Sequence, residues 1–201
     1  MLTIGITGQT GCGKTALLRR VEARGGFGVD CDALYYDLLR TDDALRAALT
    51  EAFGAVFLPD GALDRKKLGA LVFSDAAKLE RLNQIVYFHV RRAVETLQTR
   101  EKARGCTLFA VDAINLMQSG LSALCDVTVG VTAPESVRLA RIMARDGIDR
   151  AYALLRIRAQ EPEAYFREHC TCILDNGEIS PEEFQIRAEA LLDKLIKENA
   201  K

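Results

Sequence analysis

Five short apolar runs, separated by longer stretches with helical periodicity, constrain the fold of this 201-residue chain more than any other feature. The runs are LTIGIT (2–7), FGVD (27–30), TLFAVDA (107–113), CDVTVGVT (125–132) and CTCILDN (170–176). They are apolar along almost their whole length, as strands buried on both faces are, and do not alternate between apolar and polar residues. The pattern therefore predicts an α/β fold with a parallel sheet that helices cover on both faces.

Residues with helical spacing fill the stretches between these runs. Helices are expected over 14–24, 75–104, 134–146, 149–160 and 181–199. The stretch 33–104 contains no convincing buried strand and is too long for one crossover connection, so we interpret it as an inserted helical substrate-binding subdomain. The arginine-rich residues 138–160 are interpreted as a mobile lid. The sequence thus predicts a single domain whose core comprises residues 1–32, 105–137 and 161–201.

The composition argues against several classes of partner. With 27 basic and 28 acidic residues, the chain has no positive excess with which to attract nucleic acid or an anionic membrane. Its longest apolar runs are far shorter than the roughly 18 residues that a membrane-spanning helix needs. The N-terminal MLTIGITG lacks the basic leader of a signal peptide. We therefore expect a cytoplasmic protein whose six cysteines are reduced and serve packing.

The octapeptide GQTGCGKT, Gly8 to Thr15, follows the first predicted strand and precedes the first predicted helix. It matches G-x-x-x-x-G-K-[ST], the phosphate-binding loop, whose glycines let backbone N–H groups surround phosphate oxygens. Lys14 is expected to reach the β- and γ-phosphates, and the Thr15 hydroxyl to bind Mg²⁺. The predicted ligand is a nucleoside triphosphate, held by Gly8, Gly11, Cys12, Gly13, Lys14, Thr15 and Ala16.

Three carboxylates end two of the predicted strands. Asp112 ends LFAVD, where phosphate-loop enzymes carry a carboxylate that holds Mg²⁺. Asp30 and Asp32 end FGVDCD, and they would share one face if the strand stayed extended. Because ligands bind at the carboxyl ends of parallel strands, Asp32 is the candidate general base for an acceptor hydroxyl, and Asp30 is expected to support the metal. The alternative is that the carboxylates cap helices, for the last two a helix beginning near Ala33.

Further motifs follow the phosphate loop in a definite order. They are Asp30-Cys31-Asp32, GALDRKKLGALVF (61–73), Leu82-Asn83, DAINLMQSGL (112–121), Arg141 with Arg145-Asp146, an R-I-x-x-Q stretch at 156–160, and ILDNG (173–177). Only the loop is specific by itself, whereas the ordered set is much more so. In this order, and over nearly the whole chain, the motifs resemble those of the dephospho-coenzyme A kinase family.

The resemblance implies a three-layer P-loop kinase fold of the nucleoside-monophosphate-kinase type. It also implies a reaction in which ATP phosphorylates the ribose 3′-hydroxyl of dephospho-coenzyme A, giving coenzyme A and ADP. ATP and dephospho-coenzyme A are then the small-molecule partners, Mg²⁺ is the cofactor, and Asp32 is the family's candidate base. We expect a monomer or a weak homo-oligomer.

Three arginines are candidates for holding phosphate groups. Arg141 and Arg145 are four residues apart and therefore share one helix face, and the planar guanidinium fork suits phosphate oxygens. Arg65 is the candidate for binding the anionic acceptor from the inserted subdomain. The alternatives are a solvated basic face for the pair and a surface ion pair with Asp64 for Arg65. His89 is expected to be structural, because nothing acidic is spaced to partner it.

The chain departs from the family pattern at three places, which concern the details of acceptor binding. Tyr87-Phe88 stands where the family has His-Pro, Gln118 where it has Glu, and Ala16 where it has a second hydroxyl. Two alternative functions stay open at this point. One is a kinase of another small alcohol, of the shikimate or gluconate type, and the other is a degenerate member that binds ATP without transferring phosphate. A guanine-nucleotide switch is disfavoured, since the chain has no N/T-K-x-D loop.

Overall fold

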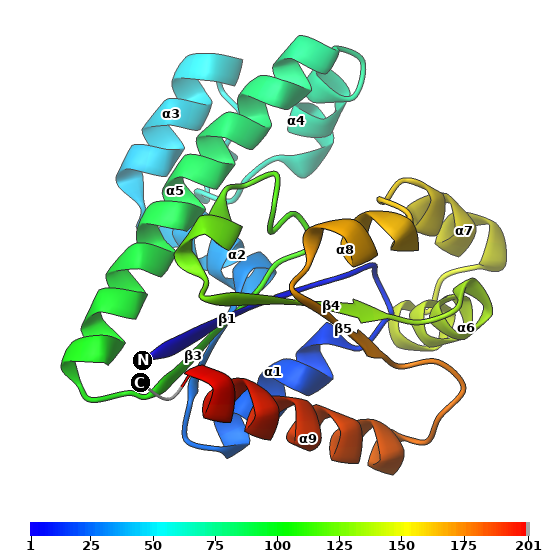
Figure 1. Cartoon of the computed structure of the whole chain (residues 1–201). Helices are drawn as coiled ribbons and strands as arrows, with labels where there is room; N and C mark the ends of the chain where they lie inside the picture. The colour runs from blue at the N-terminus through cyan, green and yellow to red at the C-terminus, as the bar shows by residue number, and fades with distance from the viewer. Residues whose placement is uncertain (200–201) are drawn as a thin grey trace. The chain divides into compact units, whose positions relative to one another are not determined.

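Strands and helices alternate along much of the chain in the computed structural model, which describes residues 1–199 (Figure 1). The elements are β1 (Leu2–Thr7), α1 (Lys14–Ala23), β2 (Phe27–Asp30), α2 (Cys31–Thr41), α3 (Asp43–Phe53), α4 (Arg65–Val72), α5 (Ala76–Ala103), β3 (Leu108–Asp112), the short 3₁₀ helix η1 (Leu121–Leu124), β4 (Val127–Thr132), α6 (Glu135–Asp146), α7 (Arg150–Arg158), α8 (Glu163–His169), β5 (Cys172–Asp175) and α9 (Pro181–Asn199). The five predicted strands and the five predicted helices are all present.

The five strands form one sheet in the order β2-β3-β1-β4-β5, and every neighbouring pair is parallel. The parallel sheet predicted from the apolar runs is therefore confirmed. Because all strands run the same way, their carboxyl ends meet at one edge. The order places β1, which leads into the phosphate loop, between β3 and β4.

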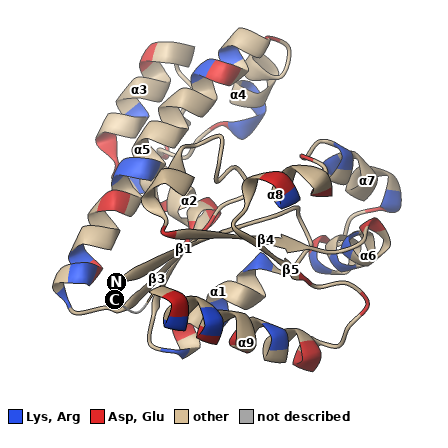
Figure 2. Ribbon diagram, viewed as in Figure 1, with Lys and Arg blue, Asp and Glu red and all other residues tan. Residues whose placement is uncertain are grey.

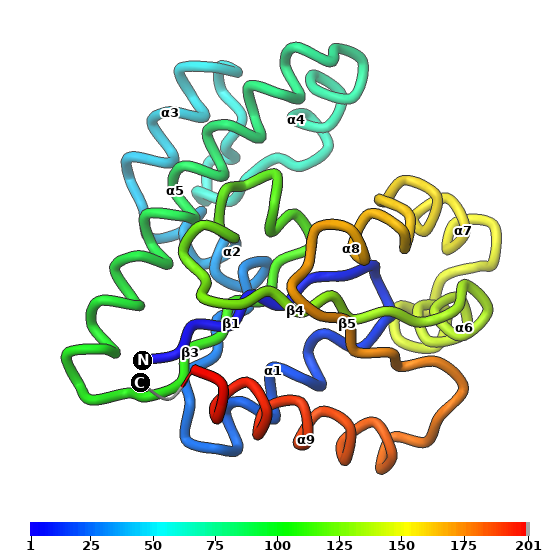
Figure 3. The backbone as a smooth tube through the Cα atoms, viewed as in Figure 1, coloured from blue at the N-terminus to red at the C-terminus, as the bar shows by residue number. Residues whose placement is uncertain are grey.

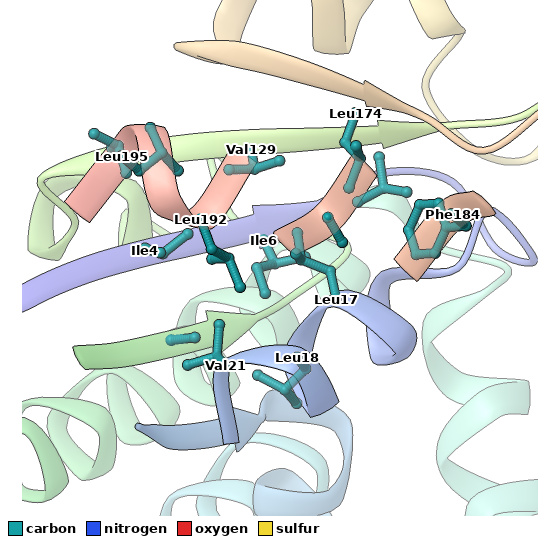
Figure 4. Close-up of a cluster of buried hydrophobic side chains, with 14 of the residues drawn as sticks. Ile4, Ile6, Leu17, Leu18, Val21, Val129, Leu174, Phe184, Leu192 and Leu195 are labelled. Carbon is teal, nitrogen blue, oxygen red and sulfur yellow. The ribbon is translucent and has the colours of Figure 1, made fainter. Parts of the chain in front are cut away.

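Helices α1 and α9 cover one face of the sheet and bury a large apolar cluster against it (Figure 4). The helices contribute side chains at three- and four-residue spacing, and the strands contribute every second residue, as these periodicities require. The labelled members are Ile4, Ile6, Val129 and Leu174 from the strands, Leu17, Leu18 and Val21 from α1, and Phe184, Leu192 and Leu195 from α9. This burial fixes the start of α1 against the end of β1.

The opposite face is covered by α8 and by the segment around η1 (Figure 1). A side chain on Gly5 would overlap Leu116 and Cys125, so this segment packs directly on β1. On β4, Gly130 leaves room in the same way for α8. The sheet thus lies between two layers of helical structure, and the predicted three-layer α/β fold is confirmed.

The chain divides into two compact units, residues 1–30 with 98–201, and residues 31–97. The first contains the whole sheet, and the second contains α2, α3, α4 and most of α5. The last turns of α5 belong with the sheet because Gln98 donates a hydrogen bond to Thr3 Oγ1 at 2.8 Å and another to Leu124 O at 3.1 Å. The helical unit therefore begins and ends a few residues earlier than the insertion predicted over 33–104. The predicted lid over 138–160 contains most of α6 and all of α7, and these helices share a small core of Ile142, Ala153 and Ile157.

The helical unit has an apolar core of its own. Buried leucines and valines of its four helices pack around Leu45, Leu49 and Val56, whose side chains are wholly inaccessible to solvent. Two helix starts are fixed by side-chain caps, because Asp42 accepts from the N–H groups of Ala44 and Leu45, and Asp64 accepts from that of Lys67. The unit is thus held by its own core and caps.

Two local predictions were wrong. The pair Asp30 and Asp32 does not lie on an extended strand, because β2 ends at Asp30 and α2 begins at Cys31, two residues before the expected start. The sequence analysis also missed α8, a helix of seven residues in which only Phe166 is buried. One buried position gives no helical period, so such a helix leaves no recognisable pattern in the sequence.

Basic and acidic residues are interspersed along the helices (Figure 2). All six cysteines are unpaired thiols, as predicted. Within residues 1–199, none of the helices combines the length and the apolar character that crossing a bilayer would require.

Candidate active site at the phosphate loop

The phosphate loop, residues 8–15, connects β1 to α1 (Figure 3). Two of its glycines could not be replaced without moving the loop. Gly8 has φ of 137°, and a side chain there would overlap the carbonyl oxygen of Val131. Gly13 has φ of 105°, and its side chain would overlap the amide nitrogen of Asn176. Both backbone conformations favour glycine, so the motif's spacing reflects the shape of this turn.

The start of α1 is arranged to receive an anion. Its N-cap is Gly13, which offers no side-chain cap, and its first turn contains no acidic residue. Uncapped N–H groups and the positive end of the helix dipole both favour a phosphate at this place. The Lys14 ammonium lies over the loop and donates to the carbonyl oxygens of Gly8 at 3.0 Å and Gln9 at 3.2 Å. The cation is therefore already held beside the N–H groups of the loop.

A residue far along the chain clamps the loop from one side. Asn176, which directly follows β5, is buried and donates to the carbonyl oxygen of Cys12 at 2.8 Å. Arg141 donates to the carbonyl oxygen of Gly11 and to both oxygens of Asn176, each at 3.3 Å. The first predicted phosphate-binding arginine is thus in contact with the loop. Asn176 belongs to the ILDNG motif, but sequence reasoning gave it no role, since the contact spans 164 residues.

A second clamp closes on the loop from the other side, after α7. Gln160 Oε1 accepts the N–H of Thr10 at 2.8 Å, and Gln9 donates to the carbonyl oxygen of Glu161 at 2.9 Å. Gln118, the residue that replaces the family's Glu, donates to Glu161 Oε1 at 3.5 Å. A carboxylate therefore still lies beside position 118, contributed by a different segment. Gln160 ends the R-I-x-x-Q motif, to which the sequence analysis had assigned no function.

The two predicted metal carboxylates come together at the edge of the sheet. Asp30 and Asp112 are paired residues in the register of β2 and β3, and Asp112 is also paired with Ile6 of β1. The Asp112 side chain is 6% exposed. It lies two and four positions after Ala110 and Leu108 of the core cluster, so it points to the same face of the sheet, the one covered by α1. Thr15, exposed in the first turn of α1, belongs to the same unit.

The donor set fits Mg²⁺. This ion is usually held by one or two carboxylates together with water and substrate phosphates, and dedicated protein cages for it are uncommon. In accordance with that, residues 1–199 contain no cluster of three or more His, Cys, Asp or Glu side chains suited to a metal. Two carboxylates and one hydroxyl beside a phosphate loop match the chemistry of the ion.

Asp32 lies in the first turn of α2, in the helical unit, and its side chain is exposed. An acidic residue in the first turn is favourable to the helix dipole, so a structural contribution accompanies any catalytic one. Asp30 belongs to the sheet and directly precedes α2. The two carboxylates thus lie on different elements: Asp30, predicted to support the metal, on β2, and Asp32, the predicted base, on α2.

The arginines of α6 have different surroundings. Arg145 is exposed and pairs with its neighbour Asp146, donating from Nε at 2.7 Å and from Nη2 at 3.1 Å. Asp146 also accepts from Arg156 of α7, and these hydrogen bonds hold the pKa of its carboxyl at about 2. Arg138 is 5% exposed, donates from Nε to Ala133 O, and has an Nη1 without a partner in the described chain. Burial lowers the pKa of its guanidinium.

The Cys12 side chain lies inside the loop and is fully buried. Burial raises the pKa of its thiol, although the charge of Lys14 acts in the opposite direction. The thiol therefore stays protonated at neutral pH and serves packing, as expected for these cysteines.

One alternative and one stated reason do not hold in the helical unit. The alternative pairing of Arg65 with Asp64 is not present, since the guanidinium lies over the ring of Tyr36, 4.5 Å from the ring centre. His89 does have an acidic partner, since its Nδ1 lies 2.8 Å from Asp42 Oδ2. Burial would raise the pKa of the Asp42 carboxyl, but the hydrogen bonds from His89 and from two backbone N–H groups lower it overall. The partner was missed because it is 47 residues away in the sequence.

Comparisons with known proteins agree on one family. Residues 2–181 match the family model described as dephospho-CoA kinase. The dephospho-CoA kinase of Anaeromyxobacter dehalogenans is 38% identical over 196 residues, which cover 97% of this chain and 92% of that protein. A crystal structure of a Thermus thermophilus protein is 34% identical with a TM-score of 0.78, covering 96% of this chain and 97% of that one. Dephospho-CoA kinase from Campylobacter jejuni, at 19% identity and a TM-score of 0.70 over 98% of each chain, shares the fold.

Proposed function

The chain belongs to the dephospho-CoA kinase family, and we propose that its phosphate loop holds ATP for transfer of the γ-phosphate to the ribose 3′-hydroxyl of dephospho-CoA. The family predicted from the order of the motifs is thereby confirmed. The protein is an enzyme, an ATP-dependent kinase of coenzyme A biosynthesis. The observation that carries the rest of the proposal is the loop itself, in which Lys14 lies beside the uncapped start of α1.

Phosphoryl transfer asks little covalent chemistry of the protein, which must position the reactants and neutralise charge. The N–H groups of residues 11–16 bind the phosphates of ATP, and Lys14 leaves the carbonyl oxygens of Gly8 and Gln9 for the β- and γ-phosphates. Asn176 and Gln160 keep the loop in its binding shape from either side. Because the loop is held before the nucleotide arrives, binding spends little free energy on ordering it.

Mg²⁺ would be held by Thr15 and Asp112, with Asp30 supporting it. When bound, the ion neutralises charge on the β- and γ-phosphates. The place of Asp112 supports this assignment, since it is buried at the carboxyl end of β3 and lies opposite Asp30 in the register of the sheet.

Asp32 is the proposed general base that takes the proton of the acceptor hydroxyl. Its exposure on the first turn of α2 supports this role, since the acceptor can reach it. Arg141 and Arg145 are proposed to bind phosphate oxygens. Arg141 is already in contact with the loop, whereas Arg145 must first exchange its partner Asp146 for a phosphate. This exchange fits a lid over 138–160 that closes when both substrates are bound.

The remaining parts of the proposal follow from composition. A monomer or weak homo-oligomer in the cytoplasm, with no nucleic-acid partner, agrees with the near-neutral charge and the unpaired cysteines. Residues 31–97 are proposed to bind the acceptor.

The test is product formation by the purified full chain with ATP, Mg²⁺ and dephospho-CoA, followed by chromatography of the nucleotides. We expect coenzyme A and ADP in equal amounts, and no product when Mg²⁺ is removed by a chelator. Dephospho-CoA left unchanged while ATP binds normally would indicate a member that binds nucleotide without transferring phosphate. Position-specific analysis of the product distinguishes the 3′-hydroxyl from the 2′-hydroxyl.

A further inference from the structure

An arginine of the helical unit lines two hollows of that unit. Arg65, at the start of α4, is exposed, and within residues 1–199 its guanidinium forms no ion pair or hydrogen bond, although Asp64 precedes it directly. The carboxylate of Asp64 is occupied as the cap of α4. The Arg65 guanidinium rests instead on the Tyr36 ring of α2, 4.5 Å from the ring centre. Stacking on an aromatic ring leaves the N–H groups at the edge of the guanidinium available to an anion.

Two hollows meet at this Arg65–Tyr36 pair, and both residues line each of them. The apolar hollow, of about 230 Å³, lies between α2 and α4 and is lined mainly by leucines, Val72 and the aromatic rings of Tyr35 and Phe73. The polar hollow, of about 370 Å³, is lined by Ala33, Asp37 and Arg40 of α2 and by the turn at Gly61. A ligand that occupies both therefore has an anionic centre with an apolar or weakly polar arm on one side.

Phe73 lies at the edge of the apolar hollow and is 81% exposed, the largest exposed fraction among the large hydrophobic side chains described. It ends the GALDRKKLGALVF block, whose other members Leu63, Leu68 and Val72 line the same hollow. An exposed phenylalanine next to an apolar hollow gains by covering a ligand. Several residues of the block thus line one hollow, a shared position that the sequence alone did not reveal.

Asp32 lies one helical turn from the Arg65–Tyr36 pair. Asp32 and Tyr36 are four residues apart on α2, so their side chains are neighbours on one face of that helix. One turn of an α-helix is about 5.4 Å. This distance is comparable with the distance spanned by the few bonds between a ribose 3′-hydroxyl and the 5′-phosphate of the same nucleotide.

From these positions we propose that residues 31–97 bind dephospho-CoA in a fixed direction, with its diphosphate on Arg65 and its pantetheine arm in the apolar hollow under Phe73. The inference rests on the proposed function, and it adds which part of the substrate Arg65 binds and which part the apolar hollow takes. With the diphosphate on Arg65, the ribose extends along α2 toward Asp32. The aliphatic and amide groups of pantetheine suit a hollow whose lining is apolar apart from two tyrosines and Arg65 at its edge with the second hollow.

The direction has a consequence for specificity. Nucleotides that lack the pantetheine arm, AMP for example, retain the anion and the hydroxyl but leave the apolar hollow without contacts. A hydrophobic pocket discriminates by about 10- to 200-fold for each lost group. The apolar hollow would therefore distinguish the acceptor from the free adenine nucleotides present with it, including ATP.

The experiment uses a fragment of the acceptor, so that binding of the pantetheine arm and of the phosphate is measured separately from phosphoryl transfer. Binding of 4′-phosphopantetheine, which contains the arm and one phosphate but no ribose, is measured calorimetrically on the full chain and on its variants. Phe73→Ala should weaken it about tenfold, the lower end of the range for a lost hydrophobic contact, and Arg65→Gln by a similar factor through loss of the charge. Ile186→Ala, which removes an exposed apolar side chain of α9 outside both hollows, should leave the affinity unchanged.

Steady-state kinetics give the second measurement. Phe73→Ala should raise KM for dephospho-CoA about tenfold with kcat within twofold and KM for ATP unchanged, because the arm is remote from the reacting hydroxyl. Equal KM values for dephospho-CoA in Phe73→Ala, Ile186→Ala and the parent would overturn the placement of the arm while leaving the proposed reaction intact. Parent protein that binds 4′-phosphopantetheine normally but forms no coenzyme A would instead overturn the proposed reaction and leave the placement intact.

Discussion

The phosphate loop and the acceptor-binding unit solve the problem of holding an anion by opposite means. In the loop the anion site consists of backbone N–H groups, and side chains from distant segments only hold it in shape. The acceptor site proposed for residues 31–97 consists of side chains on helix surfaces, with Arg65 resting on the Tyr36 ring. Backbone sites depend on glycine spacing and so accept little change, whereas side-chain sites can be rebuilt by single substitutions. The comparison teaches why the loop has a motif that is specific by itself, whereas the motifs of residues 31–97 are specific only as part of an ordered set.

The largest effect is expected at Lys14, the one side chain of the loop that should contact phosphate by charge. Lys14→Ala should lower kcat by about 10²- to 10³-fold, the size found when one donor to developing charge is removed. The hydrogen bonds of its ammonium to the carbonyl oxygens of Gly8 and Gln9 are local to the loop, so the fold should persist. Turnover and thermal unfolding are measured together. Near-normal turnover in a folded variant would mean that the backbone N–H groups of the loop bind the phosphates without help from the Lys14 charge.

Asp32 tests the unit of residues 31–97, where a single side chain should act as the general base. Asp32→Asn keeps the shape of the side chain but cannot accept the hydroxyl proton, so kcat should fall about 10²-fold or more. KM for ATP should change little, since the nucleotide is bound by the other unit. The matched control is Asp30→Asn on the neighbouring strand end, whose defect should be smaller and should lessen as Mg²⁺ is raised. Full activity in Asp32→Asn would reject the general base and leave Asp32 only the role of a favourable charge at the start of α2.

The same contrast decides how much could be predicted from the sequence. Continuous apolar runs determine a buried parallel sheet, and the motif determines its turn, so β1, the loop and α1 were all predictable. The clamps of the loop were not, because Asn176 and Gln160 reach it from β5 and from the end of α7. Nor was the stacking of Arg65 on Tyr36, which depends on how two surface helices pack. Contacts of this kind have no local pattern, and only the folded chain brings them together.

The clamp at Asn176 should give an intermediate effect. In Asn176→Ala the buried carbonyl oxygen of Cys12 loses its donor, which costs about 1–3 kcal/mol of unfolding free energy. For a chain of this size that lowers the melting temperature by roughly 2–12 °C. KM for ATP should rise as well, because the loop is no longer held in its binding shape. Asn176→Asp is the matched control, since it keeps an acceptor for Arg141 but cannot donate to Cys12.

If Asn176→Asp behaves like the alanine variant, the donated hydrogen bond is what shapes the loop. If it behaves like the parent, the contact with Arg141 is sufficient, and the loop depends on a side-chain pair in the way that the acceptor-binding unit does. Calorimetry of ATP binding and thermal unfolding distinguish these outcomes without any assay of transfer.

The smallest effect is expected at Asp146, which joins α6 to α7 by accepting from Arg145 and Arg156. Its carboxyl pKa of about 2 lies below the ordinary value near 3.9, so its contribution to stability is present above about pH 4 and is lost as the pH falls through 2. Asp146→Asn should speed amide exchange in residues 150–158 only a few-fold at pH 7, since exposed pairs contribute little. The difference from the parent should shrink in 1 M salt, where charges are screened within about 3 Å. Asp37→Asn, which breaks the exposed pair with Arg40 in the other unit, is the matched control and should leave this exchange unchanged. An Asp146→Asn variant whose exchange equals the parent's at every pH would show that the apolar contacts of Ile142, Ala153 and Ile157 hold the two helices together without the charges.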